Sequence, residues 1–109
     1  MSYRDGADFE RELVVRFRAE GWVAHRAAGS KGTADVFAFS PGRAVVVNAK
    51  TSGWAGPSER NVMASEWHAV EYVIPVLASR RGPRGYADWR ALNPFGLMVA
   101  TEPPWEWLK

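Results

Sequence analysis

The sequence predicts an α/β sandwich in which helices flank a central mixed β-sheet. The predicted order is one helix, three strands, a second helix and two further strands. Two observations carry this prediction. Apolar residues recur at helical spacing in two segments, and the segments between and after them are short apolar or alternating runs bounded by glycine and proline. The 109 residues suffice for one domain, so we expect a single domain over residues 1–109.

The first predicted helix covers residues 7–20. Phe9, Leu13 and Phe17 recur there at helical spacing with charged residues between them, which is typical of an amphipathic helix with one face on the core. Gly21 is a plausible end for this helix, because glycine readily takes the conformation that follows a last helical turn.

Three strands are predicted next, over residues 22–26, 36–39 and 44–49. A glycine-rich loop at 29–33 separates the first two, and a tight turn at 40–42 separates the second from the third. The third run is apolar throughout, which predicts that this strand is buried on both faces.

The second helix is predicted over residues 59–72, with Ser58 as its N-cap. Strands over 74–78 and 86–92 follow, joined by a basic turn, and the tail from Asn93 is expected to lack long regular structure. The tail is too apolar for a free terminus, so we expect it to cover the core or a dimer interface. Its apolar side chains include Phe95, Leu97, Met98, Val99, Trp105 and Trp107.

Composition excludes several classes of protein. There is no cysteine, so disulfides and thiolate metal sites are excluded, and no apolar run approaches the roughly 18 residues of a membrane span. The polar, acidic N-terminus resembles neither a signal peptide nor a transit peptide. We therefore expect an intracellular, cytoplasmic protein. The basic residues are mostly arginine, whose planar fork suits phosphate, which favours a nucleic-acid partner.

Three polar residues lie at the ends of two neighbouring strands. Asp35 opens the second predicted strand, and Asn48 and Lys50 close the third, so pairing of these strands would bring all three to one edge of the sheet. Mg²⁺ prefers oxygen ligands, and Lys50 could orient a water and stabilise charge that develops on a phosphate. Glu10, from the first helix, could add a further oxygen ligand. Each residue alone has an ordinary structural interpretation, but together they indicate a metal-dependent nuclease.

Four segments extend this pattern: residues 6–13, residues 21–30, Asp35-Val36 and residues 47–50. They resemble the archaeal-type Holliday junction resolvases (Hjc) of the PD-(D/E)XK restriction-endonuclease-like superfamily. Residues 74–78 also match, so the resemblance covers roughly residues 6–92. It implies a restriction-endonuclease-like sandwich and a homodimer that makes paired symmetric nicks in four-way DNA junctions, with Mg²⁺ as cofactor and Mn²⁺ as a possible substitute.

The resemblance also implies roles for individual residues. Glu10, Asp35 and position 48 correspond to metal-binding acids, Lys50 to the catalytic lysine, and Ser30 to a loop serine that assists cleavage. DNA recognition would rest on backbone shape, with basic side chains on phosphates. The candidates are Arg4, Arg11, Arg26, Lys31, Arg80, Arg81 and Arg84. Trp54, in a glycine-rich loop, could stack on a base or pack at an interface.

Asn48 departs from the family pattern, which has Glu at this position. An amide oxygen can still ligate a hard cation but carries no charge, so we expect weaker metal binding, which Asn48→Glu should tighten. A natural variant that still cleaves, a natural binder that no longer cleaves and an engineered inactivation would each explain Asn48. We favour the first, because Glu10, Ser30, Asp35 and Lys50 remain. The alternative functions are a nickase acting on other branched DNA, a non-catalytic junction-binding protein and a structural dimerisation domain.

Overall fold

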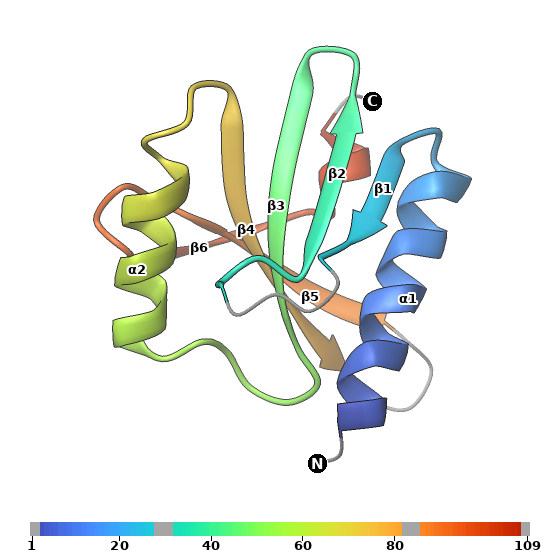
Figure 1. Ribbon diagram of the computed structural model, residues 1–109, viewed down its shortest axis with the longest axis horizontal. Helices are drawn as coiled ribbons and strands as arrows, with labels where there is room; N and C mark the ends of the chain where they lie inside the picture. Colours follow the sequence, from blue (N-terminus) through green and yellow to red (C-terminus); the bar gives the residue numbers. More distant parts are fainter. Residues whose placement is uncertain (1–2, 28–31, 82–85, 108–109) are drawn as a thin grey trace.

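The computed structural model of the protein is a six-stranded sheet with a helix on either side (Figure 1). The structure describes residues 3–27, 32–81 and 86–107. The elements are α1 (Tyr3–Ala19), β1 (Val23–Arg26), β2 (Val36–Ser40), β3 (Arg43–Lys50), α2 (Pro57–Trp67), β4 (Val73–Arg81), β5 (Tyr86–Leu92), β6 (Met98–Thr101) and the 3-10 turn η1 (Pro104–Glu106). The predicted order is confirmed, and β6 is added to it. Neither described helix is long and apolar enough to cross a membrane.

The strands lie in the sheet in the order in which they occur in the chain. Every neighbouring pair is antiparallel except β3 and β4, which run parallel with Asn48 beside Leu77 and Lys50 beside Ser79. The helix α2 provides the crossover between them, because parallel neighbours cannot be joined by a tight hairpin. The sheet is therefore mixed, as predicted.

Two separate apolar cores lie on the two faces of the sheet. Phe17 of α1 belongs to one core together with Val47 of β3, and Met63 of α2 belongs to the other together with Val46. Alternate side chains of a strand point to opposite faces, so β3 is buried on both, as the apolar run predicted. By the same alternation, Asn48 and Lys50 share the face of Val46, which α2 covers.

The start of α2 differs from the prediction. The helix begins at Pro57, with Gly56 rather than Ser58 as the N-cap, and it ends at Trp67 rather than near residue 72. Proline suits the first helical position because it has no N–H to leave unbonded there and its φ is already close to the helical value. The strand β4 also runs further than predicted, so that Arg80 belongs to the strand rather than to a turn.

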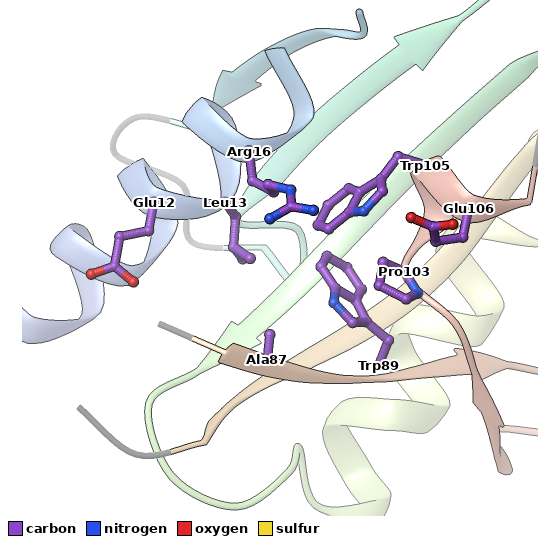
Figure 2. A pocket seen from close by; sticks show the side chains of 8 residues that line it. All are labelled: Glu12, Leu13, Arg16, Ala87, Trp89, Pro103, Trp105 and Glu106. Carbon is purple, nitrogen blue, oxygen red and sulfur yellow. The ribbon is translucent and has the colours of Figure 1, made fainter. Parts of the chain in front are cut away.

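The tail divides between a structured and an exposed part. Trp105 is buried against α1 and β5. Its ring packs edge-on against two others, with ring centroids 5.0 Å apart for Phe17 and 5.4 Å apart for Trp89. Figure 2 shows the two tryptophans of this cluster, and the Arg16 guanidinium lies over the Trp105 ring. Phe95, in contrast, is 83% exposed. A hollow of about 370 Å³ beside the cluster is lined by Glu12, Leu13, Arg16, Ala87, Trp89, Pro103, Trp105 and Glu106.

The tail therefore covers the core at Trp105, one of the two places expected for it. The described part of the tail contains no long regular element, as expected, but it does contain the short strand β6, which pairs with β5 and extends the sheet. The strand is short, and its residues Met98–Thr101 are all at least partly exposed, so it carries little of the apolar pattern by which a strand is predicted.

Candidate active site

Asp35 is fixed by its backbone and by its side chain. Its N–H donates to the carbonyl of Val47 at 2.7 Å, its carbonyl accepts from Ala27 at 2.9 Å, and its Oδ2 accepts from the N–H of Ala49 at 2.8 Å. The Ala49 N–H lies between Asn48 and Lys50 in β3, so this hydrogen bond brings the Asp35 carboxylate to the end of the strand that carries both residues. The expected meeting of the two strand ends therefore occurs.

Asn48 is 2% exposed and makes two hydrogen bonds through its amide nitrogen. Nδ2 donates to the carbonyl of Thr33 at 2.8 Å and to Oε2 of Glu59 at 2.9 Å. Both partners are acceptors, so the orientation of the amide is determined, since a flipped amide would place its oxygen against two other oxygens. Asn48 Oδ1 is buried and has no hydrogen-bond partner among the residues that the structure describes.

Glu59 completes the group and was not predicted from the sequence. It lies in the first turn of α2, where Oε2 accepts from Asn48 and Oε1 lies 3.0 Å from Nζ of Lys50. The sequence does contain a signal for this position. Glu59 precedes the buried Met63 by four residues, and residues four apart share one face of a helix.

The charges around Asp35 favour its protonated form. The pKa of Asp35 is raised from 3.8 to about 6, chiefly by burial; the carboxylates of Glu10 and Glu59 also act to raise it, whereas the Ala49 N–H and the Lys50 ammonium act to lower it. A carboxylate that is buried near two others is destabilised in its ionised form. A bound cation would reverse this effect, so the electrostatics suit a positively charged ligand.

Glu10 lies on the other side of the sheet from Asn48 and Lys50. Its helix α1 packs on the opposite core, and Oε1 accepts from Nε of Arg26 at 3.1 Å. Glu10 still acts on the pKa of Asp35 through its charge. Within residues 3–27, 32–81 and 86–107, no three acidic, histidine or cysteine side chains are grouped closely enough to hold a metal ion. Ser30, the other predicted site residue, lies outside the described residues.

Thr33 connects the loop before β2 to the far end of α2. Its hydroxyl donates to Oε1 of Glu66 at 3.2 Å and accepts from Nε1 of Trp67 at 3.1 Å. Its carbonyl is the one that Asn48 binds. The helix α2 is thus attached to the same loop segment at both ends, through Glu59 and Asn48 at one end and through Thr33 directly at the other.

The predicted DNA-binding arginines with described side chains all pair with acids of α1. The pairs are Arg11 with Asp8, Arg26 with Glu10 and Arg80 with Glu12. The remaining candidates have side chains outside the described part of the chain, and they are Arg4, Lys31, Arg81 and Arg84. Trp54 packs against the core under α2, with the guanidinium of Arg90 4.3 Å from its ring centre.

A mixed sheet flanked by helices, with Asp35, Asn48 and Lys50 at adjacent strand ends, defines an α/β fold of the nuclease type. A family profile described as archaeal Holliday junction resolvase (Hjc) matches residues 1–57, which is just over half of the chain. The chain belongs to this family, as the sequence resemblance indicated.

Two known proteins show the extent of the similarity. The crossover junction endodeoxyribonuclease Hjc of Methanocaldococcus jannaschii is 44% identical over 50 residues, which cover 46% of this chain and 37% of that protein. The match thus spans little more than a third of the relative. The structure of Archaeoglobus fulgidus Hjc, a Holliday junction resolvase, superposes with a TM-score of 0.63 at 21% identity, over 83% of this chain and 73% of that one. This likeness confirms the predicted fold.

Proposed function

We propose that this protein is a metal-dependent endodeoxyribonuclease that nicks four-way DNA junctions. The observation that carries the proposal is the meeting of Asp35, Asn48 and Lys50 at one end of β3, where Glu59 contacts both Asn48 and Lys50, in a resolvase-family fold. Family membership and the name of the Methanocaldococcus relative, a crossover junction endodeoxyribonuclease, support a junction as the substrate. Paired symmetric nicks would require two equivalent sites, which a homodimer supplies through its two-fold symmetry.

The donor groups present fit a hard divalent cation. Asn48 Oδ1 is buried without a partner among the described residues, and Asp35 is a half-buried carboxylate with a raised pKa. Mg²⁺, or Mn²⁺ in its place, binds oxygen ligands of this kind, and Asp35 with Asn48 Oδ1 would hold it. Glu10 remains a candidate ligand, and its carboxylate forms an ion pair with Arg26. When bound, the cation would neutralise phosphate charge and lower the pKa of an attacking water.

The other residues act on the phosphate and its surroundings. The Ala49 N–H fixes the Asp35 carboxylate, so its direction is set before any ligand binds. The Lys50 ammonium, which pairs with Glu59, would orient a water and stabilise negative charge that develops on the phosphate oxygens. Basic side chains such as Arg26 would contact the DNA backbone, which gives recognition by shape rather than by base sequence.

A cleavage assay tests this proposal. A labelled synthetic junction, a flap and a linear duplex are each incubated with the protein over a titration of Mg²⁺ and Mn²⁺. We expect nicking of the junction in preference to the other two substrates, and loss of nicking in Asp35→Asn. Binding of the junction without cleavage at any metal concentration would instead show a non-catalytic junction-binding protein. Equal cleavage of the flap would point to a nickase for other branched DNA.

A further inference from the structure

We propose that Glu59 is a ligand of the metal ion, so that α2 supplies the carboxylate that Asn48 does not. This inference rests on the proposed nuclease function and names a residue outside the pattern from which the site was predicted. The donor set would then be the carboxylates of Asp35 and Glu59 with the amide oxygen of Asn48. Two of the three donors carry charge.

The contacts of Glu59 place it within this set. One carboxylate oxygen lies 2.9 Å from Asn48 Nδ2 and the other lies 3.0 Å from Lys50 Nζ, so Glu59 touches two of the three residues that the strand ends bring together. The Glu59 side chain is 35% exposed, so it is open to solvent on one side, whereas Asn48 is buried.

Asn48 is the residue that allows a carboxylate to come from α2. Its Nδ2 donates to Thr33 and to Glu59 at the same time. A glutamate at position 48 has no N–H, and its oxygens would face the Thr33 carbonyl and a second carboxylate. Both contacts would become repulsive. The amide at position 48 and the acid at position 59 are therefore complementary, and the amide keeps its own oxygen available.

The unpartnered oxygen is an independent indication of a ligand. Asn48 is 2% exposed, and its Oδ1 has no hydrogen-bond partner in the described part of the chain. Buried polar atoms in native proteins nearly always have a partner, so an exception calls for one that is not a protein atom. The nitrogen of the same amide binds Glu59, so the unpartnered oxygen and the Glu59 carboxylate belong to one group of side chains.

A plainer role for Glu59 is that of counter-ion to Lys50, assisted by its favourable place in the first turn of a helix. The two roles differ in their effect on metal binding. Removal of a counter-ion changes metal affinity only through the lost charge, which added salt screens, so Glu59→Gln would then weaken binding by a small, salt-dependent factor. A ligand lost from the metal weakens binding directly.

The test measures Mn²⁺ binding by calorimetry on the full chain without DNA. We expect Glu59→Gln to weaken Mn²⁺ binding about tenfold or more, by analogy with the loss of groups around other metal sites. Glutamine keeps the size of the side chain and an oxygen for the Asn48 amide, so the fold should persist. Glu66→Gln is the matched control, because Glu66 lies on the same helix and contacts Thr33 rather than Asn48 or Lys50.

A swap of the two side chains extends the test. In the variant Asn48→Glu with Glu59→Gln, the carboxylate moves from α2 to β3, and we expect Mn²⁺ affinity to return toward that of the unmodified protein. A cooperative thermal melt establishes that the double variant is folded, and a folded variant that stays weak would contradict the exchange of charge between the two positions. The single substitution decides the inference whatever the double variant does.

The outcomes separate this inference from the proposed function. If Glu59→Gln binds Mn²⁺ as tightly as the unmodified protein, and both nick junctions, the nuclease proposal stands and Glu59 is not a ligand. If the unmodified protein neither binds Mn²⁺ nor nicks a junction, both proposals fail. Weak Mn²⁺ binding in Glu59→Gln, with tight binding in Glu66→Gln, supports the ligand role.

Discussion

Asp35→Asn should make the metal-free protein more stable at neutral pH. The pKa of Asp35 is raised from 3.8 to about 6, chiefly because the carboxylate is buried. A group whose folded pKa lies above its unfolded value contributes stability that is complete below pH 3.8 and is lost as the pH rises through 6. At pH 7.5 the ionised Asp35 therefore destabilises the fold. Asparagine removes the charge, and its amide oxygen can still accept from the Ala49 N–H.

The size of the effect follows from the shift. Each pKa unit corresponds to about 1.4 kcal/mol, so a rise of about two units corresponds to roughly 3 kcal/mol. This figure is an upper bound on the destabilisation. Asp35 is partly open to water, which screens its charge, so about 1 kcal/mol is a better expectation. For a domain of this size, a gain of that order raises the melting temperature by about 5 °C.

Thermal melts in EDTA at pH 5 and pH 7.5 measure this difference directly. We expect Asp35→Asn to melt above the unmodified protein at pH 7.5 and the gap to narrow at pH 5. Addition of Mg²⁺ should raise the melting temperature of the unmodified protein and leave that of the variant unchanged, since ligand binding stabilises only the form that binds. A variant that melts below the unmodified protein at pH 7.5 in EDTA would refute the reasoning.

Three further predictions concern other residues. Asn48→Glu should lower the free energy of unfolding in EDTA by about 1–3 kcal/mol, because the Thr33 carbonyl loses its hydrogen-bond donor and Glu59 acquires a negatively charged neighbour. Urea denaturation measures this change, and an unchanged denaturation midpoint would contradict the prediction. Lys50→Gln should abolish nicking while a gel shift still shows junction binding; loss of binding would assign Lys50 to recognition instead. Trp105→Ala should cost about 3–5 kcal/mol of unfolding free energy, since the ring packs on Phe17 and Trp89; a loss below about 1 kcal/mol would show that the tail is dispensable.

The sequence predicted those parts of the fold that depend on local pattern. The apolar run over β3 predicted burial on both faces, and period-two alternation placed Asn48 and Lys50 on one face. The start of α2 was misplaced because Ser58 is a strong N-cap residue, yet Pro57 takes the first helical position and moves the cap to Gly56. Here two local preferences compete, and the sequence alone does not rank them.

The parts of the candidate site that the sequence did not predict depend on contacts between elements that are distant in the chain. The pattern of α1 predicted that Phe9 faces a core, but not which face of the sheet that core occupies. The structure puts α1, which contains Glu10, on one face of the sheet and α2, which contains Glu59, on the other (Figure 1). The resemblance indicated an acid from α1, whereas the acid in contact with Asn48 comes from α2. Long-range packing decides this, and periodicity contains no information on it.

Two features of the site favour a catalytic protein over a non-catalytic junction binder. Asp35 is ionised at a cost in stability, and Asn48 Oδ1 is buried without a partner among the described residues. Each is unfavourable in the protein alone, and an apolar residue at either position would avoid it. A scaffold that only binds phosphates needs neither, because its contacts are made by cations on the surface. A single divalent cation would relieve both at once, which is the reason that Asn48 does not count against cleavage.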